Sequence, residues 1–175
     1  MDRTHPHLRL HRGLHLEPGD VVSEPLHFVV NRHHATTLHF DLRLEVAGQL
    51  VSWAVPKGPT LDPAAKRLAV RVEDHELDEH LTWEDERKVV WDTGLYQPAT
   101  DPGPALDTGH LRFALAGHKL RGAFALSQTR MGGDERNWIL VKLDDEYAVS
   151  GHLWTAEDHG SVLSDRWLEV DREGG

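Results

Sequence analysis

Residues 38–46 read Leu-His-Phe-Asp-Leu-Arg-Leu-Glu-Val, and this stretch alternates apolar and polar side chains without a break. Successive side chains of a β-strand point to opposite faces, so strict alternation is typical of a strand with one face in a core. We therefore predict a strand over this stretch, with its apolar side chains buried. On the opposite face His39, Asp41 and Arg43 then stand side by side in a row.

Further segments along the chain share this short length and period-two pattern, and turn residues separate them at close intervals. Many short strands spaced in this way are typical of a β-sandwich or a β-barrel. We predict a mainly β protein, a small single-domain β-barrel with one or two short helices. The other expected strands are Leu26–Asn31, Leu50–Val55, Arg67–Glu73, Lys88–Trp91, Leu111–Leu115, Lys119–Ser127 and Asn137–Leu143.

The connections contain few helical patterns. A short helix is expected at Glu84–Lys88, and another at Thr155–Leu163, which opens with the threonine and aspartate of a capping box. Residues 97–109 are rich in proline and glycine, so we expect no regular structure there. Ala47–Gln49 has the length and the glycine of a tight hairpin loop.

Composition sets limits on the class of protein. The 175 residues are 39% hydrophobic and include 6 Trp, which is enough for one packed core and excludes a wholly disordered chain. With 0 Cys the chain has no disulfide, no thiolate nucleophile and no cysteine-ligated metal. Any metal must therefore be bound by His, Asp or Glu, and 14 His are available.

Charge and hydropathy bear on partners and location. The net charge is 19 − 29 = −10, which counts against nucleic-acid binding unless a local cationic surface or a bound cation is present. No run of apolar residues is long enough to span a membrane, and the first residues lack the apolar core of a signal peptide. We expect a soluble, cytoplasmic protein with no membrane partner.

The chain divides into three parts by composition. Residues 1–20 carry four His and three Arg and end on Pro18-Gly19, so we expect a mobile His-rich arm. Residues 21–170 are expected to form the barrel domain, and residues 171–175 a frayed tail.

The polar row of the strand at 38–46 is the candidate site. Same-face neighbours on a strand lie about 6.5 to 7 Å apart, close enough for His39 and Asp41 to bind one divalent cation. An adjacent guanidinium, Arg43, can then hold two oxygens of a phosphate. One of His33 and His34 is expected to supply a further ligand.

Other interpretations of the row remain open at this level. It can be the solvated face of an amphipathic edge strand. Alternatively, His39, Asp41 and His75 can form the two-histidine, one-carboxylate triad of a cupin-like Fe(II) oxygenase.

Several linked motifs resemble one known family. They are His33-x5-His39-x-Asp41-x-Arg43, Ser52-Trp53-Ala54-Val55-Pro56-Lys57-Gly58-Pro59, Lys66-Arg67-Leu68-Ala69-Val70, Val72-Glu73-Asp74-His75 and Val90-Trp91-Asp92. In this order they resemble the 3′-phosphoesterase domain of bacterial DNA ligase D. The resemblance covers about residues 28–92, with weaker similarity to about residue 143. The fold it implies is a small β-barrel.

The resemblance also implies an activity and a set of site residues. Members of the family use a divalent metal, usually manganese, to remove 3′-ribonucleosides and 3′-phosphates from DNA ends in repair by non-homologous end joining; zinc also suits such ligands. The implied metal ligands are His33, His39 and Asp41, the implied catalytic residues Arg43 and His75, and the implied phosphate-binding residues Lys57 and Arg67. The implied partners are DNA 3′ ends and a separate repair ligase or polymerase, since we expect a chain that stands alone.

One segment departs from the family pattern. Glu79 stands where the family has a tyrosine, and the loop at 79–87 is shortened and acidic. These changes fall on the substrate side of the site. They leave a second hypothesis, in which the chain is a catalytically impaired module that binds DNA 3′ ends.

Overall fold

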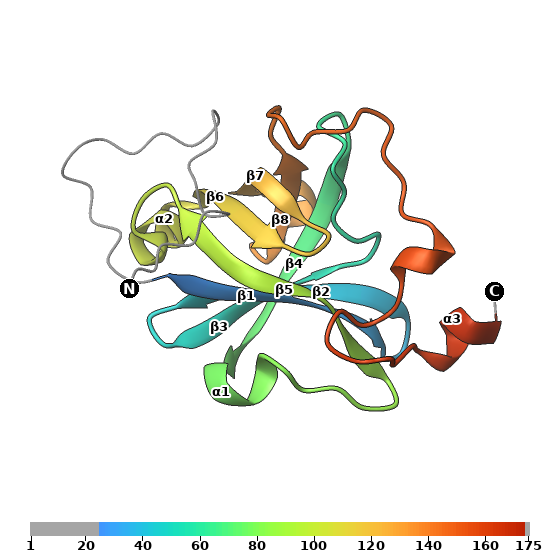
Figure 1. Ribbon diagram of the computed structural model, residues 1–175. Coiled ribbons are helices and arrows are strands. Elements are labelled where there is room, and N and C mark those ends of the chain that lie inside the picture. The colour runs from blue at the N-terminus through green and yellow to red at the C-terminus, as the bar shows by residue number, and fades with distance from the viewer. Residues whose placement is uncertain (1–24, 174–175) are drawn as a thin grey trace, which may run out of the picture.

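Eight antiparallel strands form a closed barrel in the computed structural model, which describes residues 25–173 (Figure 1). The strands follow the order β1-β2-β3-β4-β8-β7-β6-β5 around the barrel. Their bounds are β1 Leu26–His34, β2 Leu38–Val46, β3 Gln49–Val55, β4 Lys66–Glu76, β5 Lys88–Pro98, β6 His110–Gly117, β7 Arg121–Gln128 and β8 Asn137–Lys142. Every expected strand is present, and the predicted fold, a mainly β barrel, is confirmed.

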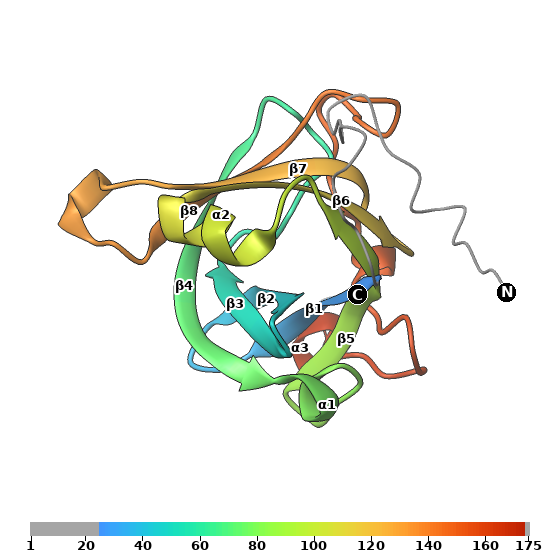
Figure 2. The same cartoon turned by 90° about the vertical axis from the view of Figure 1, so that its left-hand side faces the viewer.

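Closure comes from β1, which pairs with β2 on one side and with β5 on the other. Figure 2 shows the strands as a ring. A closed barrel has no unpaired edge strand, and its interior is filled by alternate side chains of every strand. The largest buried side chains of this interior are aromatic, among them Trp53, Trp91, Phe28, Phe113 and Phe124.

The hairpin between β2 and β3 has the predicted tight turn. Ala47 has φ 53° and Gly48 has φ 83°. Two successive residues with positive φ form the turn whose twist matches that of the flanking strands. The register then pairs Arg43 with Ser52 across the hairpin.

A second, smaller apolar cluster lies on the outside of the barrel. Val29, Leu50 and Val90 point outward from β1, β3 and β5 and are fully buried. Leu77, Leu81 and Val162 pack against them. Leu77 belongs to α1 (Leu77–His80), so this short helix and the chain after it cover the outer face beside the polar row of β2. The row is therefore not a freely solvated surface.

The helices differ from the expectation in three places. The helix expected at Glu84–Lys88 is wrong, because Lys88 begins β5 and the Glu84 side chain accepts a hydrogen bond from Val90 N. Thr155–Leu163 forms only one 3-10 turn, Ala156–Asp158, although the predicted capping box is present. Residues 97–109 contain the end of β5 and a helix, α2 (Pro102–Thr108). Proline at the first helical position and Gly109 after the last explain how breaker residues can bound a helix.

The C-terminal segment runs down the outside of the barrel to α3 (Glu169–Glu173) (Figure 1). Asp171 in α3 accepts two hydrogen bonds from Arg32, so the tail that we expected to fray from residue 171 is docked on β1 as far as the structure describes it. The expected His-rich arm, residues 1–20, lies outside the described residues. Within the described part of the chain, no helix is both long enough and apolar enough to span a bilayer.

Candidate functional site

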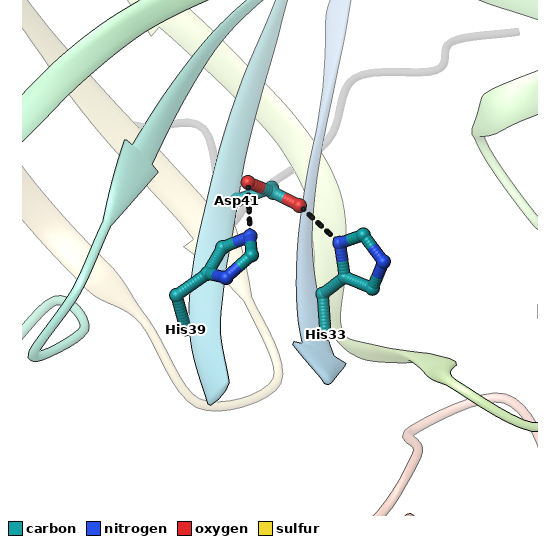
Figure 3. Close-up of side chains that lie close together, drawn as sticks. All are labelled: His33, His39 and Asp41. Atoms are coloured by element: carbon teal, nitrogen blue, oxygen red, sulfur yellow. Dashed lines mark hydrogen bonds and ion pairs between the residues drawn. The ribbon is translucent and has the colours of Figure 1, made fainter. Parts of the chain in front are cut away.

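Three potential metal ligands meet at the turn that joins β1 to β2 (Figure 3). His33 and His39 are cross-strand partners, so their side chains lie on the same outer face. Asp41 follows two residues later on that face and lies between them. Its Oδ2 is 3.2 Å from His33 Nδ1, and its Oδ1 is 3.2 Å from His39 Nε2. Of the two candidates at 33 and 34, the structure therefore brings His33 to the site.

The donor set fits a divalent cation. One ligand atom from each of the three residues lies within 4.8 Å of the others. His39 Nδ1 lies 3.1 Å from the carbonyl oxygen of Thr37 and donates to it, while Nε2 faces Asp41 Oδ1 and donates to it when the ring is protonated. On loss of that proton, Nε2 is the nitrogen whose lone pair can bind a cation. Metal-binding imidazoles commonly have their second nitrogen held in this way. Two imidazoles and a carboxylate suit manganese or zinc.

The electrostatics keep Asp41 in its charged form. Burial would raise the pKa of Asp41, but hydrogen bonds from His33 and His39 and the charge of Arg43 outweigh burial and hold this pKa well below its usual range. The same carboxylate raises the pKa of His39 through their hydrogen bond. Asp41 thus favours protonated imidazoles beside it. A divalent cation bound here would take over their role as the counter-charge of Asp41.

Arg43 organises the neighbouring part of the site. Its Nε donates to Asn31 Oδ1 at 3.0 Å, and its Nη1 donates to Ser52 Oγ at 3.0 Å. The same Nη1 lies 2.8 Å from His75 Nδ1, and Nη2 lies 3.4 Å from Asp41 Oδ2. Because a guanidinium is planar, these contacts fix its orientation between the potential metal ligands and His75.

His75 reaches the site from β4. Both ring nitrogens of His75 lie near Arg43 Nη1, Nδ1 at 2.8 Å and Nε2 at 3.3 Å. A guanidinium can only donate, so the nearer nitrogen, Nδ1, is the unprotonated acceptor. Burial and the charge of Arg43 both lower the pKa of His75. The ring is therefore neutral near pH 7 and keeps one N–H that can donate to a phosphate oxygen or a leaving oxygen.

The two remaining basic residues lie apart from these contacts. Lys57 is exposed in the turn after β3, and Arg67 Nε donates to the carbonyl oxygen of Gly58. Among the described residues, no hydrogen bond or ion pair joins either of them to the ligand cluster. Lys57 and Arg67 thus lie on either side of the loop between β3 and β4, Lys57 just after β3 and Arg67 at the start of β4.

Sequence reasoning missed two buried polar residues that hold Arg43, Asn31 and Ser52. Both are fully buried, and Asn31 also donates to the carbonyl oxygen of Val89. The signal for Asn31 is a polar residue two positions before His33, and hence on the same face of the strand. No comparable signal marks Ser52, whose role depends on the register between β2 and β3.

The same residues fall within a known family. A family model described as the DNA ligase D 3′-phosphoesterase domain matches residues 31–128, which span the chain from β1 to the end of β7. The chain belongs to the DNA ligase D 3′-phosphoesterase domain family. The resemblance inferred from the sequence motifs is confirmed.

Curated relatives of this phosphoesterase domain are longer proteins. The multifunctional non-homologous end joining protein LigD of Pseudomonas aeruginosa is 46% identical over 154 residues, which are 82% of this chain and 18% of that protein. LigD of Mycolicibacterium smegmatis is 37% identical over 68% of this chain and 17% of that protein. The corresponding protein of Mycobacterium tuberculosis is 35% identical over 68% and 16%. The chain spans less than a fifth of the length of these relatives.

Membership of the phosphoesterase family and the geometry of the site both argue against the interpretation as an Fe(II) oxygenase. That interpretation requires His75 as a ligand beside His39 and Asp41. In the structure the Arg43 guanidinium lies between His75 and Asp41, and the third potential ligand beside His39 and Asp41 is His33. The family departure at Glu79 falls in α1, and the structure does not describe its side chain.

Proposed function

We propose that this chain is a metal-dependent phosphoesterase that trims DNA 3′ ends during repair by non-homologous end joining. Its substrates are DNA ends that carry a 3′-terminal ribonucleoside or a 3′-phosphate. The observation that carries the proposal is the convergence of His33, His39 and Asp41 beside the Arg43–His75 pair, in a chain of the phosphoesterase family. The names of the relatives supply the repair context.

The metal ligands are His33, His39 and Asp41, and we propose manganese as the metal, with zinc as the alternative. A divalent ion in such a site polarises a phosphoryl oxygen and lowers the pKa of bound water. The fixed tautomer of His39 and the charged Asp41 keep the donor atoms ready for the cation.

The protein's own residues bind and orient the phosphate. Arg43 stays charged, and its fixed guanidinium neutralises charge on the phosphoryl oxygens. His75 donates its free N–H to the phosphate or to the leaving oxygen. Lys57 and Arg67 bind phosphates of the DNA strand farther from the metal.

The test is metal-restored trimming of a defined primer. Metal-stripped protein receives Mn²⁺ and a labelled primer-template that ends in one ribonucleotide or in a 3′-phosphate. We expect shortening that requires metal and falls at least about 100-fold in Asp41→Asn, because the variant lacks a charged ligand. The matched control is Asp107→Asn, which changes an exposed aspartate of α2 and leaves the rate unchanged.

Two results would contradict the proposal. The first is shortening that proceeds equally well in Asp41→Asn. The second is no shortening by protein that demonstrably holds Mn²⁺. If that protein binds the 3′-phosphate end tightly without turnover, the alternative of a catalytically impaired end-binding module replaces the proposed activity.

A further inference from the structure

Lys88 is a buried lysine beside the candidate site that has no assigned role. It is the first residue of β5 and the cross-strand partner of His33. Cross-strand partners point to the same face, so the Lys88 side chain lies on the outer face that carries the metal ligands. It approaches from the β5 side of β1, whereas Arg43 approaches from β2 on the other side.

The ammonium of Lys88 lacks a partner. The residue is only 8% exposed, yet its Nζ makes no hydrogen bond or ion pair with any residue that the structure describes. Lysines are seldom buried without a counter-charge, because desolvation of an ammonium costs free energy. Three N–H donors therefore face this part of the site without a protein partner, while the rest of the side chain is buried.

The surroundings of Lys88 favour an anion. Burial and the nearby charge of Arg43 lower the pKa of Lys88, while Asp85 and Asp41 raise it. Asp85 is exposed and already accepts hydrogen bonds from Trp83 Nε1 and Arg87 N. The carboxylate of Asp41 already contacts His33 and His39. The rings of His75 and His80 have centroids 4.8 Å apart, and the pKa of each is lowered. Neither ring provides a counter-charge for the Lys88 ammonium.

We propose that Lys88 is a substrate-binding residue that takes a non-bridging oxygen of the terminal 3′-phosphate, opposite Arg43. A phosphate monoester carries up to two negative charges and a diester carries one, so an added ammonium favours the monoester. Lys88 therefore biases the site toward 3′-phosphate ends over ends that carry a ribonucleoside. This inference rests on the proposed function, because it assumes that the phosphate of a DNA end enters this site.

The test is a binding experiment without turnover. The metal is chelated, and the protein is titrated into two fluorescently labelled oligonucleotides that differ only in a 3′-phosphate or a 3′-hydroxyl. We expect Lys88→Met to weaken binding of the 3′-phosphate oligonucleotide about tenfold and of the 3′-hydroxyl one less than about twofold, as for a lost hydrogen bond to a charged group. Lys88→Arg keeps a charge and is expected to restore most of the difference.

The matched control removes a positive charge elsewhere. Arg112→Met changes an exposed residue of β6 whose carbonyl oxygen accepts from Ala99 N, just after the end of β5 opposite to Lys88. We expect it to affect both oligonucleotides equally and less than about twofold, as for distant screened charges. An equal loss on both oligonucleotides in Lys88→Met, or no loss, would overturn the inference.

Folding and catalysis are followed in parallel. Because the partial burial of Lys88 disfavours its charged form, Lys88→Met is expected to unfold at a temperature no lower than the wild type; if it does not fold, Lys88→Gln takes its place. Mn²⁺-supported trimming by the wild type tests the proposed function separately. Trimming together with unchanged binding by Lys88→Met refutes only the role of Lys88. Discrimination between the two ends without trimming refutes only the catalytic proposal.

Discussion

Arg43 joins the two halves of the candidate site. Its guanidinium contacts Asp41 on the side of the metal ligands and His75 on the other side, and it is only 3% exposed. The buried side chains of Asn31 and Ser52 accept two more of its hydrogen bonds. An arginine held from four sides can present a fixed charge to a phosphate without reorganising.

The first prediction concerns this residue. Arg43→Ala is expected to bind Mn²⁺ within about threefold of the wild type, because no metal ligand is removed, and to lose at least about 100-fold in kcat/KM for 3′-phosphate removal. Calorimetric titration and the primer assay measure the two quantities.

Arg43→Lys is the conservative variant, and it is expected to restore little activity, because a compact ammonium does not reproduce the planar fork that reaches Asn31, Ser52 and His75. The Arg43→Ala variant leaves the buried acceptors of Asn31 and Ser52 unpaired, which is expected to lower the free energy of unfolding by about 1 to 3 kcal/mol for each acceptor. Urea unfolding of the variants is therefore measured alongside activity. Full activity of Arg43→Ala would refute the phosphate-binding role.

At the scale of elements, the C-terminal helix α3 is attached to β1 by one ion pair. Arg32 Nε and Nη2 lie 2.7 and 2.8 Å from the two carboxylate oxygens of Asp171, and both side chains are less than a tenth exposed. The Arg32 guanidinium also lies over the ring of Phe40. This attachment lies one residue from His33, so docking of α3 bears directly on the strand end that carries this proposed metal ligand.

The second prediction tests that attachment. Asp171→Asn is expected to lower the free energy of unfolding by about 3 to 5 kcal/mol, because it leaves the Arg32 charge buried without a counter-charge. Urea denaturation measures the change, and faster amide exchange in α3 is expected with it. Asp165→Asn, at an exposed aspartate of the same segment, is the control. A loss below about 1 kcal/mol would show that packing rather than charge holds the helix.

At the scale of the whole molecule, a second buried ion pair fastens β8 to the chain that follows it. Lys142 Nζ lies 2.6 Å from Asp145 Oδ1, and both side chains are almost fully buried. Asp145 also accepts hydrogen bonds from the backbone N–H groups of Ala123 and Tyr147. Burial would raise the pKa of Asp145, but the bonds from Lys142 and the two N–H groups lower it below its ordinary value of 3.8.

The third prediction is the pH dependence of stability that follows. Because the folded-state pKa of Asp145 lies below its unfolded value, its contribution is fully present above about pH 4 and is lost as the pH falls through the folded-state pKa. Asp41 shifts in the same direction. Metal-free protein is therefore expected to lose stability as the pH falls from 5 to 3.

The variant Asp145→Asn isolates one of these two groups. It is expected to be less stable at pH 5 and to show a shallower decline toward pH 3, as measured by urea unfolding at each pH. A variant whose decline is as steep as that of the wild type would show that Asp145 does not contribute to the acid sensitivity.

The fold and part of the site were predictable from local pattern. A half-buried strand is marked by alternating apolar and polar residues, and this alternation is visible in consecutive residues. The strands and the row of His39, Asp41 and Arg43 could therefore be predicted without knowledge of any partner strand. The helices were less predictable. Residues 97–109 contain enough proline and glycine to suggest an irregular loop, yet those residues sit at the two ends of α2, where they are favourable.

By itself the sequence determined the barrel, the family and the polar face of β2, because these depend on periodicity and on motifs along the chain. Only the tertiary structure decided that His33 rather than His34 joins the ligands, that Asn31 and Ser52 hold Arg43, and that α3 docks on Arg32. It also placed the unpartnered Lys88 on the same face. The physical reason is that these contacts depend on register between strands and on packing between segments distant in the chain, which no local pattern contains.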